Sequence, residues 1–248
     1  MEVHHHTHTP RKKWTHYFWE FFMLFLAVTA GFLVENQREH YIEHNREKQF
    51  INSLANDIKA DTARINRIII ARTERDRKLD TLSTLMNSAS PEIHTNDIYF
   101  HAVTVARTIT IRFVPNDGTM QQLKNSGAFR LIRDREVADS IAKYDVTIRT
   151  LLRQGELEET LIHDYRQAAA ILFNALVFYQ MLDEDNVVNR ALKDNPPLLP
   201  YDKSDLYIWN YKLYSMKALN TAIRRDARQF LRQATDLLIK LKKEYHLE

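Results

Sequence analysis

The first strongly apolar stretch of the chain, FFMLFLAVTAGFLV at residues 21–34, carries no charged side chain. Extended back to Tyr17 it holds about 18 residues, which rise about 27 Å as a helix, and Glu20 is the one charge within it. This length is close to the ~30 Å hydrocarbon core of a bilayer. We therefore predict a single transmembrane helix at residues 16–35.

The flanks of this stretch favour the same prediction. Trp14, Tyr17 and Trp19 lie at its amino end, where amphipathic rings favour the lipid headgroup layer, and the basic triplet 11–13 lies just outside. Two alternatives stay open: a buried core helix, and a cleaved signal peptide, because residues 28–30 (Val-Thr-Ala) resemble a cleavage site. A core helix does not need such flanks, however, and one acidic residue and two tryptophans interrupt the signal-peptide pattern.

Small and ionisable residues within the span carry two further predictions. Ala27 and Gly31 are four positions apart on one helix face, a spacing that lets two helix backbones approach closely. This face is expected either to bring two copies of the chain together in the membrane or to hold a glycine that the helix simply tolerates. Glu20 lies near the aromatic end of the span, so its carboxylate is expected to reach the headgroup layer rather than to relay protons.

Beyond the span the chain becomes strongly charged, and its apolar residues recur every seven positions. Ile51, Ile58 and Ile65 begin this repeat, which is typical of a helix that packs along one seam. Three seam positions are charged instead: Asp61, Arg72 and Arg75. We predict a long helix at about residues 36–88 that packs partly on its own domain and partly, through the three isoleucines, on a second copy.

The remainder of the chain alternates helical patterns with turn residues. Further helices are predicted at 98–113, 119–126, 135–178 and from Ser204 or Asp205 to about Glu244, with turns at 115–118 and 195–200. Asp134 fits an N-cap, and Gly127 fits the left-handed position that closes a helix. Long helices joined by short connections, with only four glycines in the chain, favour an all-α antiparallel bundle at residues 36–248.

Two segments carry a family resemblance. They are ENQREHYIEHNREKQFINSLANDIKAD, which follows the apolar stretch, and TMQQLKNSGAFRLIRDREVADSIAKY, which holds the predicted turn and cap at Gly127. With the apolar segment before them, they resemble a family of uncharacterised bacterial single-span membrane proteins, best represented in Bacteroidetes. The resemblance covers most of the chain and implies an anchored, all-helical protein; it carries no catalytic residue with it.

Charge and composition exclude several function classes. The chain has 35 basic and 32 acidic residues, finely interspersed, for a formal net charge of +3. This balance indicates solvated helix faces and no nucleic-acid partner. No cysteine is present, which excludes thiol catalysis and thiolate zinc sites. No phosphate-loop or nucleotide-binding glycine motif occurs, and we expect no cofactor.

Histidines supply the candidate metal ligands. His40 and His44 belong to an HxxEH sequence, the pattern of inverted zinc peptidases, but a working site needs a third ligand, which the sequence does not identify. We therefore do not expect an enzyme, and an incidental metal or a pH response at this pair is the weaker alternative. A second cluster lies in the flexible tail predicted at residues 1–15, with His4, His5, His6 and His8, where a disordered polar tail is the favoured interpretation and metal binding the alternative.

Aromatic residues on the last two long helices predict core packing, with a ligand pocket between helices as the alternative. The compact basic triplet at residues 11–13 favours a cytoplasmic amino terminus, which puts the bundle on the periplasmic side of the inner membrane. We expect a non-enzymatic, self-associating membrane scaffold, with the bilayer, further copies and an unknown envelope protein as partners. The alternative is a membrane-tethered sensory or ligand-binding bundle, and the third hypothesis is a metal-binding protein.

Overall fold

The structure is a computed structural model that describes residues 13–107, 111–189, 192 and 194–247. It divides into two compact units, Met1–Gln49 and Phe50–Glu248. Helix α1, Trp14–Met86, contributes residues to both. The predicted bundle at residues 36–248 overlaps the second unit, in which Ile51 is the first buried apolar side chain.

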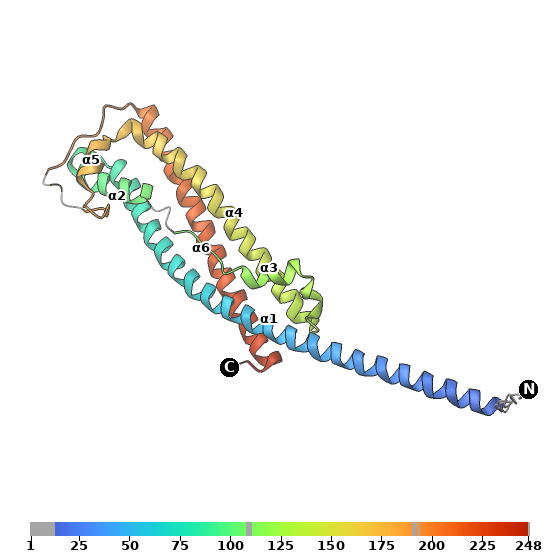
Figure 1. Ribbon diagram of the computed structural model, residues 1–248. Helices are drawn as coiled ribbons and strands as arrows, with labels where there is room; N and C mark the ends of the chain where they lie inside the picture. Colours follow the sequence, from blue (N-terminus) through green and yellow to red (C-terminus); the bar gives the residue numbers. More distant parts are fainter. Residues whose placement is uncertain (1–12, 108–110, 190–191, 193, 248) are drawn as a thin grey trace, which may run out of the picture. The chain divides into compact units, whose positions relative to one another are not determined.

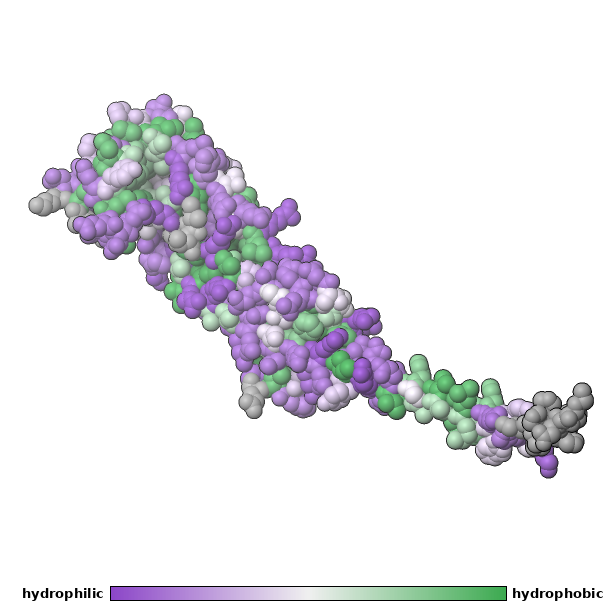
Figure 2. All heavy atoms as spheres, viewed as in Figure 1, coloured by the Kyte–Doolittle hydropathy of each residue, from purple (hydrophilic) through white to green (hydrophobic). Residues whose placement is uncertain are grey.

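In the first unit the described residues form the amino-terminal part of α1. This segment is long enough and apolar enough to cross a bilayer. None of the 18 residues in its most apolar stretch is buried. Figure 2 shows the apolar side chains on the visible face of this segment. Neighbouring aromatic rings contact each other along the helix, with centroids 6.1 Å apart for Trp14 and Phe18 and 5.8 Å for Trp19 and Phe22. Within the residues that the structure describes, one helix long and apolar enough to span a membrane is thus confirmed.

The second unit is built from helices, which confirms the all-α prediction (Figure 1). After α1 the chain forms η1 Pro91–His94, α2 Thr95–Arg107, α3 Gly118–Asn125, η3 Ala128–Leu131, α4 Arg135–Leu172, α5 Ala175–Gln180 and α6 Lys203–Tyr245. The long helices α4 and α6 lie side by side (Figure 1). Among the described residues the one β-type contact is an isolated bridge between Leu182 and Val188.

Polar side chains begin the long helices as their sequences require. The Asp134 carboxylate accepts a hydrogen bond of 2.9 Å from the backbone of Val137 and caps α4. Asp202 and Asp205 form a reciprocal capping box at the start of α6. Gly127 has φ 66° and ψ 12°, the left-handed conformation that glycine adopts without steric cost, and it separates α3 from η3 as predicted.

Three predicted helix boundaries are wrong. The helix expected at 98–113 ends at Arg107, and residues 111–117 are irregular. The helix expected to reach residue 178 ends at Leu172, where Phe173 is extended. The Asn174 side chain then caps the separate helix α5 by accepting a bond of 3.0 Å from the backbone of Leu176. Asp202, not Ser204 or Asp205, caps the last helix.

The bundle core has two hydrophobic clusters. The first contains Ile51, Ile58 and Ile65, each 0% exposed, together with side chains of α4 and α6 such as Tyr144 and Phe230. The second is centred on the opposite end of the bundle portion of α1 and on Trp209. The three isoleucines therefore pack within their own chain, and the prediction that they form a seam with a second copy is wrong.

Candidate functional site

The residues predicted to lie at the membrane are all accessible. Trp14 is 79% exposed and Trp19 60% exposed, and the His16 ring lies 3.2 Å from the Glu20 carboxylate one turn away. Ala27 and Gly31 are exposed, and a Cβ built on Gly31 would meet no atom within 4 Å. Within the first unit nothing of the described chain covers this face, so it is open to a lipid or to another helix.

The predicted histidine ligands do not come together with a third one. His40 lies 3.9 Å from Glu43, and His44 lies 3.4 Å from Glu47, each pair one helical turn apart. In the part of the chain that the structure describes, no group of three His, Asp or Glu side chains has a geometry that could hold a metal. The other cluster, His4, His5, His6 and His8, lies outside the described residues.

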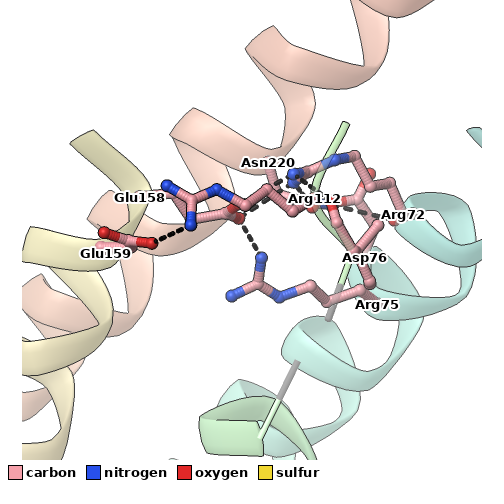
Figure 3. A network of polar contacts seen from close by, with 8 residues as sticks. Arg72, Arg75, Asp76, Arg112, Glu158, Glu159 and Asn220 are labelled. Atoms are coloured by element: carbon pink, nitrogen blue, oxygen red, sulfur yellow. Dashed lines mark hydrogen bonds and ion pairs between the residues drawn. The ribbon is translucent and has the colours of Figure 1, made fainter. Parts of the chain in front are cut away.

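A buried ionic network lies where three helices meet (Figure 3). Arg72 of α1 makes a two-pronged contact with Glu158 of α4, with Nη1 donating over 2.9 Å and Nη2 over 2.7 Å to the two carboxylate oxygens. Arg75, one turn along α1, donates from Nη1 to the same carboxylate. Both arginines are almost fully buried, at 2% and 1% exposure.

Asn220 of α6 completes this network. Its carbonyl accepts a bond of 2.9 Å from Arg72, and its amide donates over 2.6 Å to Asp76. The second oxygen of Asp76 pairs with Arg224 at 2.6 Å. Arg72 also donates over 3.0 Å to the carbonyl of Ile111, in the irregular segment after α2. The network thus ties α1, α4, α6 and that segment to one another.

Burial and ion pairing shift the pKa values of this network in opposite directions. Burial alone would raise the pKa of Glu158, but the hydrogen bonds and charges of Arg72 and Arg75 outweigh it and hold the pKa below its ordinary value. Burial lowers the pKa of Arg75, against the effect of Glu158. An arginine keeps its proton under such a shift, so the network is ionic at neutral pH.

A second buried pair lies in the first core cluster. The Tyr144 hydroxyl donates over 2.8 Å to Asp61, whose other oxygen accepts a bond of 2.9 Å from the backbone of Asn116. Burial raises the pKa of Asp61 despite both donors, and burial together with the Asp61 charge raises the pKa of Tyr144. Asp61, Arg72 and Arg75 are the three charged residues of the seven-residue repeat. Each of them makes buried polar contacts within its own chain.

An apolar groove of about 550 Å³ opens between α2, α4 and α5. Five alanines line its walls: Ala102, Ala106, Ala169, Ala170 and Ala175. Tyr165, Phe173 and Phe178 add aromatic surface, and the Phe173 and Phe178 centroids lie 5.7 Å apart. Arg166 is the one charged side chain among the lining residues. The aromatic residues of this region led to the alternative of a pocket between helices, but no signal in the sequence identified the alanines that leave the space.

The aromatic residues of α6 divide between core and surface. Trp209 is 0% exposed and packs on Phe173 with centroids 5.9 Å apart. Tyr207, Tyr211 and Tyr214 are each about two thirds exposed, at 68%, 67% and 68%.

No family model, curated protein or solved structure matches the chain, so the resemblance noted in its sequence stays a prediction.

Proposed function

We propose that this chain is a membrane-anchored helical interaction protein, held to the bilayer by the amino-terminal part of α1. The observation that carries this proposal is the most apolar stretch of α1, 18 residues of which none is buried in the chain. A soluble protein rarely leaves so large an apolar surface open, since water disfavours it. If the proposal is right, the full chain stays in membranes washed at alkaline pH, and a Leu24→Lys, Val28→Lys double variant is released.

Self-association belongs to the same proposal, with the Ala27 and Gly31 face as the contact. The buried isoleucine seam cannot supply the contact, whereas this face is open. Gly31→Leu should weaken dimerisation of the detergent-solubilised chain in sedimentation equilibrium. Phe25→Leu changes the opposite side of the same helix and serves as the matched control. A wild-type chain that is monomeric at every workable concentration would rule out this part of the proposal.

A non-catalytic role fits the way in which the buried titratable groups are used. Glu158 is held by two arginines, and Asp61 by Tyr144 and a backbone amide. These groups connect helices inside the bundle instead of lining the groove, where a substrate would meet them. We therefore assign them to stability.

For location, we propose the inner membrane with the bundle on the periplasmic side and an envelope protein as a further partner. The support is the basic triplet before the span. Ser126 is exposed and lies beside Gly127, so a Ser126→Cys variant reports the side of the bundle in a chain without other cysteines. Labelling by an impermeant maleimide in intact cells places the bundle outside the cytoplasm, and labelling only after lysis reverses the orientation.

A second candidate function, a membrane-tethered ligand-binding bundle, is favoured by the groove. Its volume of about 550 Å³ lies within the ~300–1,000 Å³ range of small-molecule sites, and its lining is mainly apolar. Binding of a ligand to the folded chain alone would raise its melting temperature. Such a rise separates this function from a purely structural anchor.

A further inference from the structure

The groove between α2, α4 and α5 owes its space to small side chains. Alanines project from all three helices, two from α2, two from α4 and one from α5. An alanine side chain fills much less volume than a leucine or phenylalanine side chain. Helices that face each other through alanines therefore either approach closely or leave a groove between them. Here the helices leave the groove of about 550 Å³.

Hydrogen bonds around the groove hold its shape. The Tyr99 hydroxyl accepts a bond of 3.0 Å from the backbone of Asn174 and donates over 3.0 Å to the carbonyl of Pro197. The backbone of Leu199, a lining residue, donates over 3.0 Å to the carbonyl of Leu172, the last residue of α4. These contacts tie the helix break and the proline-rich loop together, so the groove is formed before any ligand arrives.

Among the described residues that line the groove, Arg166 carries the one positive charge. Arg166 Nη2 donates over 2.7 Å to the carbonyl of Ala106, near the end of α2, which fixes the guanidinium at the groove wall. Within the described residues its Nε and Nη1 have no protein acceptor, and the groove lining includes no carboxylate. A guanidinium held in this way keeps N–H groups available as charge-assisted hydrogen-bond donors to an anion.

We propose that the groove binds a single-chain amphiphile with one carboxylate, of the fatty-acid class. Its hydrocarbon chain lies along the alanines and the Phe173 and Phe178 rings, and its carboxylate pairs with Arg166. One guanidinium matches one monovalent head, and the apolar lining matches a methylene chain. This inference rests on the second candidate function and does not depend on which side of the membrane the bundle occupies.

Photolabelling of the full chain in zwitterionic lipid discs tests the proposal. The probe is dodecanoate with a diazirine at its chain end, and labelled peptides are located by mass spectrometry. We expect labels in peptides that contain residues 102–106 and 165–178, suppressed by excess unlabelled dodecanoate. Labels confined to residues 14–34 would overturn the inference while leaving the anchor intact, because flotation of the same discs reports anchoring separately.

Two matched pairs of variants locate the ligand. Ala170 is exposed and lines the groove, so Ala170→Trp fills it and should abolish the groove labels, whereas Gln167→Trp places the same side chain outside the lining and should not. Because Arg166 is exposed, Arg166→Gln should weaken competition by dodecanoate about two- to fivefold, without changing competition by dodecanol. Arg153→Gln, an exposed arginine on the same helix, is the control. Unchanged labelling in Ala170→Trp would overturn the site, and equal competition by acid and alcohol would overturn the role of Arg166.

Discussion

Arg72 and Glu158, separated by 86 positions in the chain, form a two-pronged ion pair inside the bundle, with donor to acceptor distances of 2.9 and 2.7 Å. Arg75 shares the carboxylate, so one acidic side chain of α4 holds two arginines of α1. Buried charges are tolerated when they are paired, and the loss of one partner leaves the others without compensation. The register of α4 on α1 therefore depends on Glu158.

Glu158→Gln should destabilise the bundle strongly. The substitution keeps the shape of the side chain but removes the carboxylate that two buried arginines share, which costs about 3–5 kcal/mol in the free energy of unfolding. Urea unfolding followed by circular dichroism measures the change. Glu156→Gln, at an exposed position of the same helix, should change the free energy by less than about 0.5 kcal/mol. Equal effects of the two variants would contradict a structural role for the ion pair.

Acid should weaken the same contact. The folded pKa of Glu158 lies below its ordinary value of 4.5. A carboxylate with a depressed folded pKa stabilises the fold above its unfolded pKa, and this contribution is lost as the pH falls through the folded pKa. The melting temperature of the wild type should thus fall below pH 4.5, and more steeply than that of Glu158→Gln. Parallel pH profiles of the two proteins would show that Glu158 is not the group responsible.

Tyr144→Phe should show the opposite pH trend at a second site. The variant removes the hydroxyl that donates to Asp61, at a cost of about 1–3 kcal/mol for a buried acceptor left with one partner fewer. Burial already raises the pKa of Asp61, so its protonated form is favoured by folding, and its ionised form costs stability as the pH rises. The loss should be larger at pH 7 than at pH 4. Tyr179→Phe, which is 74% exposed, is the control.

Tyr99→Phe should loosen the groove. The Tyr99 hydroxyl bonds to Asn174 and to Pro197, so its removal frees the loop from the helix break. The backbone amides of Asn174 and Leu199 should then exchange hydrogen faster, while those around Ile58 stay protected. Unchanged exchange near residue 174 would show that the hydroxyl does not hold the groove.

Local signals in the sequence were enough to predict much of the fold. The seven-residue repeat from Ile51 predicts the bundle portion of α1, and Asp134 and Gly127 predict helix ends that the structure confirms. Partner choice was not predictable in the same way, because an apolar seam fits its own chain and a second copy equally well. Only the structure shows Ile51 within the core of its own chain.

Long-range pairing explains the rest of what was missed. Arg72 and Arg75 look like defects of the seam until Glu158, far along the chain, is seen beside them. The break after Leu172 depends on the Asn174 cap and on a bond from Leu199, neither of which stands out from a sequence of good helix formers. A pocket between helices was only an alternative for a related reason, since alanines indicate either close packing or empty space, and only the three-dimensional arrangement decides between them.

The most direct test of a single membrane crossing compares two cysteine variants in the otherwise cysteine-free chain. Thr9→Cys lies before the apolar segment and Ser126→Cys after it. In intact cells an impermeant maleimide should label the cysteine at position 126 and should reach the one at position 9 only after lysis. Labelling of both in intact cells, or of both only after lysis, would contradict a chain that crosses the membrane once.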